Sequence, residues 1–467
     1  MMNEKMYGTA RLTARLEPWM EELLNSPTQC RELIERHGSP VNVHNFTALG
    51  SNVNDLRASA ADHGIDFQIY FARKANKTMG AIDAAIREKC GLDVASLNEL
   101  RQCLHRGVPA ERIIVTAAVK SKELLQLAMK SRVTISIDND DELRDLLDLA
   151  GDRGDDLIVA LRLAISHTSI PPTRFGLLAS QWLEVLSEIE PGARIRVAGI
   201  HFHLNGYEAS ARAHGITEAL KVIQELRIMG HQPTFVDMGG GIPMSYLYSG
   251  SQWEEFWSIL EQLPAGDETL TWKSDRLGVS GGAPTAGVYP YHQDLVRGHW
   301  LTRILDFEPE SGSSSIASSL RAAQIQLRCE PGRSLLDGCG LTLAEVAFTK
   351  NRSDGVPLVG LHMNRTQCRS TSADFLVDPV LVHEDPVRRK RTPGSGFLVG
   401  AYCIEEELLL RRRFEFPLGV GARDIVAFPN TAGYLMHIVE SASHQLPLAA
   451  NVLWDGAAWQ GDDIDKM

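Results

Sequence analysis

The sequence predicts an α/β fold: a (β/α)8 TIM-type barrel joined to a second, mainly β domain. Three observations support this prediction. Short β-branched runs alternate with stretches of helical period from about residue 66, polar residues follow the ends of most of these runs, and the alternation stops after Arg333. Eight such units at a near-regular spacing favour a closed barrel over an open, doubly wound sheet.

The expected barrel covers residues 45–340 and contains eight strands. They are Gln68–Arg73, Leu92–Ala95, Arg112–Ala117, Val133–Asp138, Leu157–Leu163, Val197–His203, Thr234–Met238 and Ile325–Cys329. Helical periodicity lies between the early strands, over Lys77–Lys89, Leu97–Arg106, Ser121–Lys130 and Asp140–Leu149. We therefore expect helices to cover the outside of the barrel.

Residues 1–44 and 341–467 are expected to form the mainly β domain. Its strand-like runs are Leu341–Phe348, Pro357–Leu361 and Asp424–Phe428. Ile404–Phe414 is expected to be a helix, the one long helix after the barrel. The turn and strand at Gly38–Val43 precede the barrel, and we expect this strand to pair with the later ones.

A long segment, about residues 244–323, separates the seventh and eighth strands. It holds four of the eight tryptophans, Trp253, Trp257, Trp272 and Trp300. A structureless loop of this length is unusual in a compact domain, so the segment is expected to be packed. The favoured interpretation is an insertion that covers an edge of the barrel. A lid or a dimer contact is the alternative.

Charge and cysteine content exclude several classes of protein. The 467 residues include 47 Lys and Arg against 59 Asp and Glu, a formal charge of −12, which disfavours binding to nucleic acid or to an anionic membrane. The seven cysteines are scattered and form no CxxC pair, so we expect no metal site and no disulfide framework. No apolar run of about 18 residues occurs. A cytoplasmic enzyme with reduced thiols is the expectation.

Polar residues stand at the expected C-terminal ends of the strands, where the active sites of such barrels lie. They are Lys74 after the first strand, Asp93 in the second, Arg162 in the fifth, His201 and His203 in the sixth, the glycines Gly239, Gly240 and Gly241 after the seventh, and Glu330, Gly332 and Arg333 after the eighth.

These residue types suit one cofactor, pyridoxal 5'-phosphate (PLP). Burial lowers the pKa of a lysine, as Schiff-base chemistry requires, so Lys74 is the candidate nucleophile; a salt-bridged lysine at the barrel rim is the alternative. The three glycines next to Arg333 favour phosphate binding. Glu330 could hold a pyridine nitrogen protonated, which suits decarboxylation. His203 could stack on the ring, although His201 and His203 could equally be core histidines.

Seven motifs resemble those of a known family. They are FARKAN, GLDVASLNEL, HFHLNG, FVDMGGGIP, CEPGR, GAYCIEEELL and AGY, in this order. The chain thereby resembles the PLP-dependent decarboxylases of the alanine-racemase fold (fold type III), which include diaminopimelate, ornithine and arginine-type enzymes. The resemblance runs from about Gly38 to Tyr434, nearly the whole chain.

The resemblance implies a role for each matched residue. Lys74 binds the cofactor covalently and His203 stacks on it; Gly239, Gly240, Gly241, Arg333 and, from the second domain, Tyr434 contact the phosphate; and Glu330 contacts the pyridine nitrogen. Cys403 matches a cysteine that enters the partner subunit's site and helps to protonate the carbanion. A homodimer with shared active sites is therefore implied.

The chain also departs from the family pattern. Asn205-Gly206 stands where relatives have Gly-Ser, Ile404 replaces an acidic residue after Cys403, and an expected aspartate is absent near His362. Glu405, Arg365 and Arg369 are the candidate substrate-binding residues. Arg365 and Arg369 could equally be solvent-facing.

The predicted activity is decarboxylation of an amino acid. The substrate would resemble diaminopimelate, lysine, ornithine or arginine, or be a conjugate of these, and the products would be carbon dioxide and an amine. Two alternatives remain open. One is an amino-acid racemase or epimerase, which Glu330 disfavours because racemase relatives have an arginine at the pyridine nitrogen. The other is a PLP-binding regulator or inactive relative.

Overall fold

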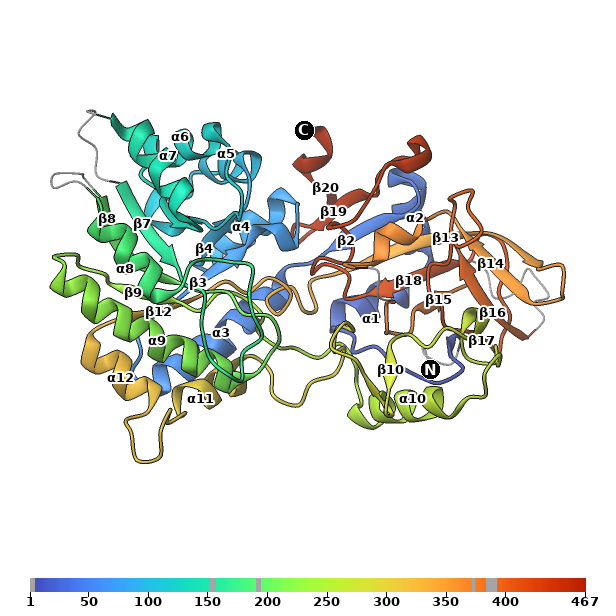
Figure 1. The fold of residues 1–467 in the computed structure, drawn as a ribbon. Coiled ribbons are helices and arrows are strands. Elements are labelled where there is room, and N and C mark those ends of the chain that lie inside the picture. Colours follow the sequence, from blue (N-terminus) through green and yellow to red (C-terminus); the bar gives the residue numbers. More distant parts are fainter. Residues whose placement is uncertain (1–4, 152–156, 190–194, 372–373, 384–392) are drawn as a thin grey trace.

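The computed structural model describes residues 5–151, 157–189, 195–371, 374–383 and 393–467. It contains a closed eight-stranded parallel barrel and, beside it, a mainly β domain (Figure 1). The predicted fold class is confirmed. None of the helices in the described ranges is long and apolar enough to cross a membrane.

All eight predicted barrel strands are present. They are β3 (Phe67–Ala72), β4 (Gly91–Val94), β5 (Ile113–Val115), β6 (Thr134–Ile137), β7 (Leu157–Arg162), β8 (Ile195–His201), β9 (Phe235–Asp237) and β12 (Gln326–Cys329). The barrel closes where β12 pairs with both β9 and β3. The carboxyl ends of these strands therefore converge at one mouth.

The predicted helices follow the strands. They are α4 (Met79–Arg87), α5 (Leu97–His105), α6 (Lys122–Lys130) and α7 (Asp140–Ala150), with α3 (Thr47–Asp62), α8 (Ala179–Ser187) and α9 (Ala209–Ile228) completing this part of the layer. The side chains of Ser96, Ser121 and Asn139 accept hydrogen bonds from the first turns of α5, α6 and α7. These caps satisfy backbone N–H groups that each helix leaves unpaired.

The β domain is built on the long strand β13 (Gly340–Asn351). The first half of β13 pairs with β2 (Val41–His44) and β18 (Ile425–Pro429), and its second half pairs with β14 (Pro357–Leu361). The predicted pairing of the strand near residue 41 with later strands is thus confirmed. The other strands of this sheet are β1 (Tyr7–Gly8), β15 (Val380–Val382), β16 (Gly394–Val399), β17 (Phe414–Phe416), β19 (Ala450–Trp454) and β20 (Trp459–Gly461). Helices α1 (Pro18–Leu24) and α2 (Pro27–His37) pack on it.

The segment of residues 244–323 contacts both domains. Its helices α11 (Arg297–Leu305) and α12 (Ile316–Ala323) pack on the barrel against α3 and α9. Helix α10 (Gly250–Gln262) lies instead against the β domain, on the right of Figure 1, where Trp253 and Trp257 join its core. The small hairpin β10 (Val279–Ser280) and β11 (Ala283–Pro284) follows. Covering a barrel edge therefore describes only the second half of this segment.

The predicted helix over Ile404–Phe414 is wrong. The backbone there is used by other segments: Trp272 donates to the carbonyl of Arg411, and Leu409 donates to that of Leu398. Leu408, Leu409 and Leu410 are all buried although they are consecutive, which one face of a helix cannot achieve. The apolar run is therefore held extended between two neighbours.

The C-terminal chain caps the helix that follows the Lys74 turn. The N-cap residue of α4, Thr78, makes no side-chain cap. Instead the two carboxylate oxygens of Asp462 accept hydrogen bonds, each 2.9 Å, from the backbone N–H groups of Met79 and Gly80. Asp462 is 2% exposed, so these bonds are shielded from water. The cap joins the β domain to the barrel next to the mouth.

We expect Asp462→Ala to lower the free energy of unfolding by about 2 kcal/mol, because two buried N–H groups lose their acceptor. Chemical denaturation of the variant and the parent protein measures the difference. Asp463→Ala is the matched control, since Asp463 is half exposed and pairs with Arg106 at the surface; its effect should stay under about 1 kcal/mol. Equal effects of the two substitutions would contradict the buried cap.

Candidate active site

Lys74 lies in a single 3-10 turn, η2 (Arg73–Ala75), immediately after β3. Its Nζ donates to Asp93 Oδ2 on the neighbouring strand β4, at 2.8 Å. Thr116, after β5, donates its hydroxyl to the other oxygen of Asp93. Three neighbouring strands thus orient one ammonium group at the barrel mouth, as the sequence predicts for Lys74 and Asp93.

The pKa of Lys74 is raised rather than lowered. Burial alone lowers the pKa of this lysine, but the negative charge of Asp93, which also accepts a hydrogen bond from Nζ, outweighs burial. The expected lowering of the pKa is therefore wrong for this arrangement. Lys74 is held as an ammonium, and Asp93 is the group in contact with its proton.

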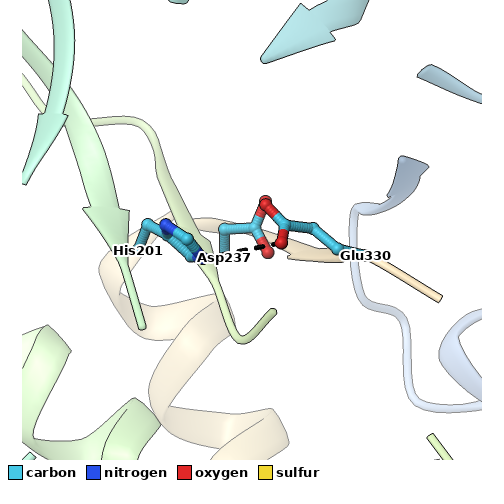
Figure 2. Close-up of side chains that lie close together, drawn as sticks. All are labelled: His201, Asp237 and Glu330. Atoms are coloured by element: carbon cyan, nitrogen blue, oxygen red, sulfur yellow. Dashed lines mark ion pairs between the residues drawn. The ribbon is translucent and has the colours of Figure 1, made fainter. Parts of the chain in front are cut away.

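Glu330, after β12, belongs to a buried polar cluster with His201 at the end of β8 and Asp237 at the end of β9 (Figure 2). One ligand atom from each residue lies within 4.8 Å of the others, and His201 Nε2 is 3.6 Å from Glu330 Oε2. On its other side, His201 Nδ1 contacts the hydroxyl of Ser136 at 2.7 Å. All three residues of the cluster are shielded from solvent.

The cluster holds two carboxyl groups that burial keeps from ionising freely. Burial raises the pKa of Asp237 to about 7 and raises that of Glu330 well above its ordinary value, while burial lowers the pKa of His201. Glu330 Oε1, Asp237 Oδ2 and His201 Nε2 have no hydrogen-bond partner. A donor from outside the protein is the natural complement of such acceptors. Three converging ligand atoms would also suit a small cation.

Arg162 and His203 line the mouth beside Lys74. The guanidinium of Arg162 donates to Asp138 Oδ1 at 2.8 Å and to the carbonyl of Thr116 at 2.9 Å, so the arginine is fixed. Phe175 packs 4.7 Å from this guanidinium and edge-on to the His203 ring, at 6.0 Å. His203 is thereby supported from one side.

His203 is neutral near pH 7. Burial lowers its pKa to about 3, and the positive charges of Lys74 and Arg162 act in the same direction. A neutral imidazole can stack against a flat aromatic ligand without the cost of a buried charge. The geometry therefore suits the stacking role predicted for His203.

The glycine triplet needs to be glycine. Gly239 and Gly241 have φ of +69° and +76°, which other residues rarely adopt. A side chain on Gly240 would come within 2.8 Å of the Glu330 carbonyl. The loop after β9 therefore lies directly against the loop after β12. Gly332 has the same role toward the β domain, because a Cβ there would meet the Tyr434 hydroxyl at 2.6 Å.

Arg333, in the loop after β12, is partly buried, and its Nη1 is shielded from water. It makes no ion pair with a carboxylate in the described part of the chain. Its Nη2 donates to Ser370 Oγ at 3.1 Å, its Nη1 has no partner, and the rings of Tyr289 and Tyr434 lie 4.0 and 5.3 Å from its guanidinium. A buried cation without a counter-charge is costly unless an anion binds to it.

The mouth thus has two unsatisfied ends. Buried acceptors at Glu330 and Asp237 require a donor, and buried donors at Arg333 require an anion. Lys74 lies within electrostatic range of Glu330 and Tyr434. A pyridinium ring that carries an aldehyde and a phosphate would satisfy both ends, so the residues fit pyridoxal phosphate.

Comparison with known proteins agrees with this geometry. Residues 51–265 match the family model "Pyridoxal-dependent decarboxylase, pyridoxal binding domain". An uncharacterized protein of Sinorhizobium fredii is 31% identical over 418 residues, which cover 89% of this chain and 87% of that protein. Diaminopimelate decarboxylase of Helicobacter pylori is 21% identical over 399 residues, 81% of this chain and 82% of the enzyme.

A solved structure shows the same fold. The Helicobacter pylori diaminopimelate decarboxylase complexed with L-lysine superposes with a TM-score of 0.67 at 16% identity, covering 93% of this chain and 97% of the other. The chain belongs to the fold type III family of PLP-dependent decarboxylases. It is a divergent member of that family, and PLP is its cofactor.

The predicted substrate-binding residues of this decarboxylase differ in their surroundings. Arg369 is buried and donates to Asp374 and to the carbonyls of Leu408 and Leu409, contacts that stabilise the β domain. Arg365 donates its backbone N–H to the carboxylate of Glu407 and its Nη1 to the backbone carbonyl of Glu406. Glu405 and Cys403 are exposed. The substrate roles of Arg365, Arg369 and Glu405 and the proton transfer by Cys403 stay predictions.

The positions that depart from the family pattern lie in different places. Gly206 has φ +86°, so a serine at this position would be strained in the loop as it stands. Ile404 is 44% exposed, and His362 lies at the surface 3.9 Å from Glu345. The change at residue 206 therefore affects the cofactor loops, whereas the changes at 362 and 404 face outward.

Sequence reasoning missed three polar residues of this decarboxylase's site. Thr116 and Ser136 orient Asp93 and His201, and Arg212 on α9 lies against the glycine loop. Asp237 stands two residues before the glycine triplet, but its contact with Glu330 depends on how β9 and β12 pair. Arg212 carries one usable signal: a charged residue in a run of small buried residues requires a partner.

Asp237→Asn should make stability less dependent on pH in the cofactor-free protein. The pKa of Asp237 is about 7 when folded against an ordinary 3.8, so folding retains a proton that the unfolded chain loses, and stability falls as pH rises between these values. Asn at this position keeps the acceptor for the Gly239 N–H. Between these two pH values, we expect the free energy of unfolding of the variant, relative to that of the parent protein, to rise by on the order of 1 kcal/mol per pH unit. Urea denaturation at several pH values measures it, and a constant difference would contradict the argument.

Proposed function

We propose that this chain decarboxylates an amino acid that resembles diaminopimelate, lysine, ornithine or arginine, or a conjugate of one of them. The products would be carbon dioxide and an amine. We propose further that it acts in the cytoplasm as a homodimer whose active sites are shared. The free state of all seven cysteines supports a reducing compartment.

The observation that carries this proposal is the buried carboxyl group of Glu330 at the barrel mouth, directly after β12. Glu330 Oε1 has no partner and lies in an acceptor cluster with Asp237. A carboxylate there would stabilise a protonated pyridine nitrogen. The chemistry that PLP supplies when bound is withdrawal of the electron pair left on the α-carbon as carbon dioxide departs.

The residues around Lys74 would hold its ammonium group and accept its proton. Asp93 Oδ2 accepts a hydrogen bond from Lys74 Nζ. Thr116 donates its hydroxyl to Asp93 Oδ1, which leaves Oδ2 for the ammonium group. Lys74 has to lose a proton before it can act as a nucleophile, and Asp93 is the acceptor at hydrogen-bond distance. His203 and Arg162 would keep the ligand in place beside them.

The loop that follows Cys403 is a candidate for binding the distal group of the substrate. The segment of residues 244–323 reaches it, because Lys273 Nζ forms an ion pair of 2.7 Å with Glu406. Glu405 lies next to this pair. A negatively charged side chain here would favour a substrate with a distal amine, and its position in an exposed loop would allow a partner subunit's substrate to approach.

The substrate proposal is tested by incubating the protein and PLP with meso-diaminopimelate, lysine, ornithine, arginine and their carboxylated conjugates, and measuring carbon dioxide and amine. We expect release from at least one of them. Lys74→Ala should lower that activity by more than about 10³-fold and abolish the absorbance of the lysine-bound cofactor. Release of no product from any of them would count against the proposal. Solvent deuterium in recovered substrate without carbon dioxide would instead indicate a racemase.

The shared active site is tested by mixing inactive variants. Lys74→Ala lacks the nucleophile and Cys403→Ala lacks the proposed proton donor. If each site takes Lys74 from one subunit and Cys403 from the other, mixed dimers contain one intact site and regain part of the activity. The control is a mixture of Lys74→Ala with Asp93→Ala. These two residues pair within one subunit, so every active site of a mixed dimer would lack one of them and no site would be intact. No recovery in the first mixture, with dimers formed, would contradict a shared site.

A further inference from the structure

Arg212 is a buried cation that the family resemblance does not account for. It lies in the first turn of α9, which begins at Ala209, and it is 0% exposed. It makes no ion pair with any carboxylate in the ranges that the structure describes, and its Nε and Nη1 have no hydrogen-bond partner. Burial lowers its pKa to about 10, which is the expected response of a guanidinium removed from water.

The guanidinium of Arg212 lies between the loop after β8 and the glycine triplet after β9. Its Nη2 donates to the carbonyl of Leu204 at 3.0 Å and to that of Gly240 at 3.3 Å. A Cβ on Gly241 would come within 2.5 Å of the same nitrogen. Arg212 therefore contacts the loop after β8 and the glycine triplet after β9 at once. The ring of Trp300 lies on another side, 5.9 Å from the guanidinium.

We propose that Arg212 is an additional binding residue for the cofactor phosphate, whose negative charge it balances while it holds the two loops together. This inference rests on the proposed cofactor site. Two cations without carboxylate partners in the described residues, Arg212 and Arg333, both lie close enough to Tyr207 for their charges to lower the pKa of its hydroxyl, against the stronger effect of burial, which raises it. A phosphate ester carries up to two negative charges, so it could match both of them.

The loop itself explains why this chain would need Arg212. The family resemblance implies a serine where this chain has Gly206, and the φ of +86° at Gly206 disfavours any residue with a side chain. The hydroxyl is therefore missing from the loop that carries His203. Arg212 follows shortly after in the chain and supplies N–H donors and a full charge behind that loop.

The test compares PLP with pyridoxal, which lacks the phosphate, as ligands of the full chain after removal of the cofactor. Binding is measured by equilibrium dialysis and by absorbance. We expect Arg212→Gln to weaken PLP roughly 10- to 100-fold while changing pyridoxal affinity by less than about 3-fold. Inorganic phosphate should raise the melting temperature of the parent protein but not that of the variant.

The matched control is Arg412→Gln. Arg412 is as buried as Arg212, but it pairs with Asp378 at 2.8 Å inside the β domain. Its substitution should lower stability and leave the ratio of PLP to pyridoxal affinity unchanged. If Arg212→Gln does not fold, Arg212→Lys keeps the charge with fewer donors, and it should bind PLP more weakly than the parent protein, again with little change for pyridoxal.

Two outcomes separate this inference from the proposed function. A parent protein that binds PLP normally, together with folded Arg212 variants whose PLP-to-pyridoxal ratio is unchanged, would overturn the role of Arg212 alone. A parent protein that binds neither aldehyde would overturn the proposed cofactor site, and this inference with it. A selective loss of PLP affinity, with protection by phosphate abolished, would support both.

Discussion

The mouth of the barrel buries polar groups that its own residues leave without partners, and the architecture around it follows from that constraint. The carboxyl groups of Asp237 and Glu330 each keep one oxygen without a hydrogen-bond partner on one side, and the guanidinium groups of Arg212 and Arg333 lie without carboxylate partners in the described residues on the other. Only Lys74 has a direct counter-ion, Asp93, within this group. Buried charges of this kind persist only when something compensates them. A ligand with a cationic ring and an anionic arm does so.

The barrel supplies the rigidity that such an arrangement requires. Lys74, Asp93, His201, Asp237 and Glu330 all lie in or directly after strands of one closed sheet. Tyr434 arrives from the β domain, and its backbone N–H donates to the carbonyl of Ala75 at 2.8 Å. The lysine turn is therefore held by both domains. Neither the barrel nor the β domain alone completes the pocket.

Much of this arrangement was predictable, because each strand leaves a local signal. Short β-branched runs mark the barrel strands, and parallel strands bring their carboxyl ends together, so Lys74, Glu330 and the glycine triplet could be placed at one mouth. Other features depend on contacts between distant segments. The absence of a helix over Ile404–Phe414, the raised pKa of Lys74 and the contact of Arg212 with Gly240 depend on neighbours from other parts of the chain. Apolar content and residue type alone do not reveal such neighbours.

The capping of α4 by Asp462 has a consequence for how the protein forms. Strand β2 pairs with β13 and β19, and Asp462 reaches back 383 residues to the start of α4. A ribosome releases the barrel strands, the last of which ends at Cys329, long before β19 and Asp462 exist. The barrel can then close early through contacts between neighbouring units, whereas the β domain and the turn that holds Lys74 are completed last. Lys74 would be ordered only after nearly all of the chain has been made, so truncated products would hold a barrel without a finished site.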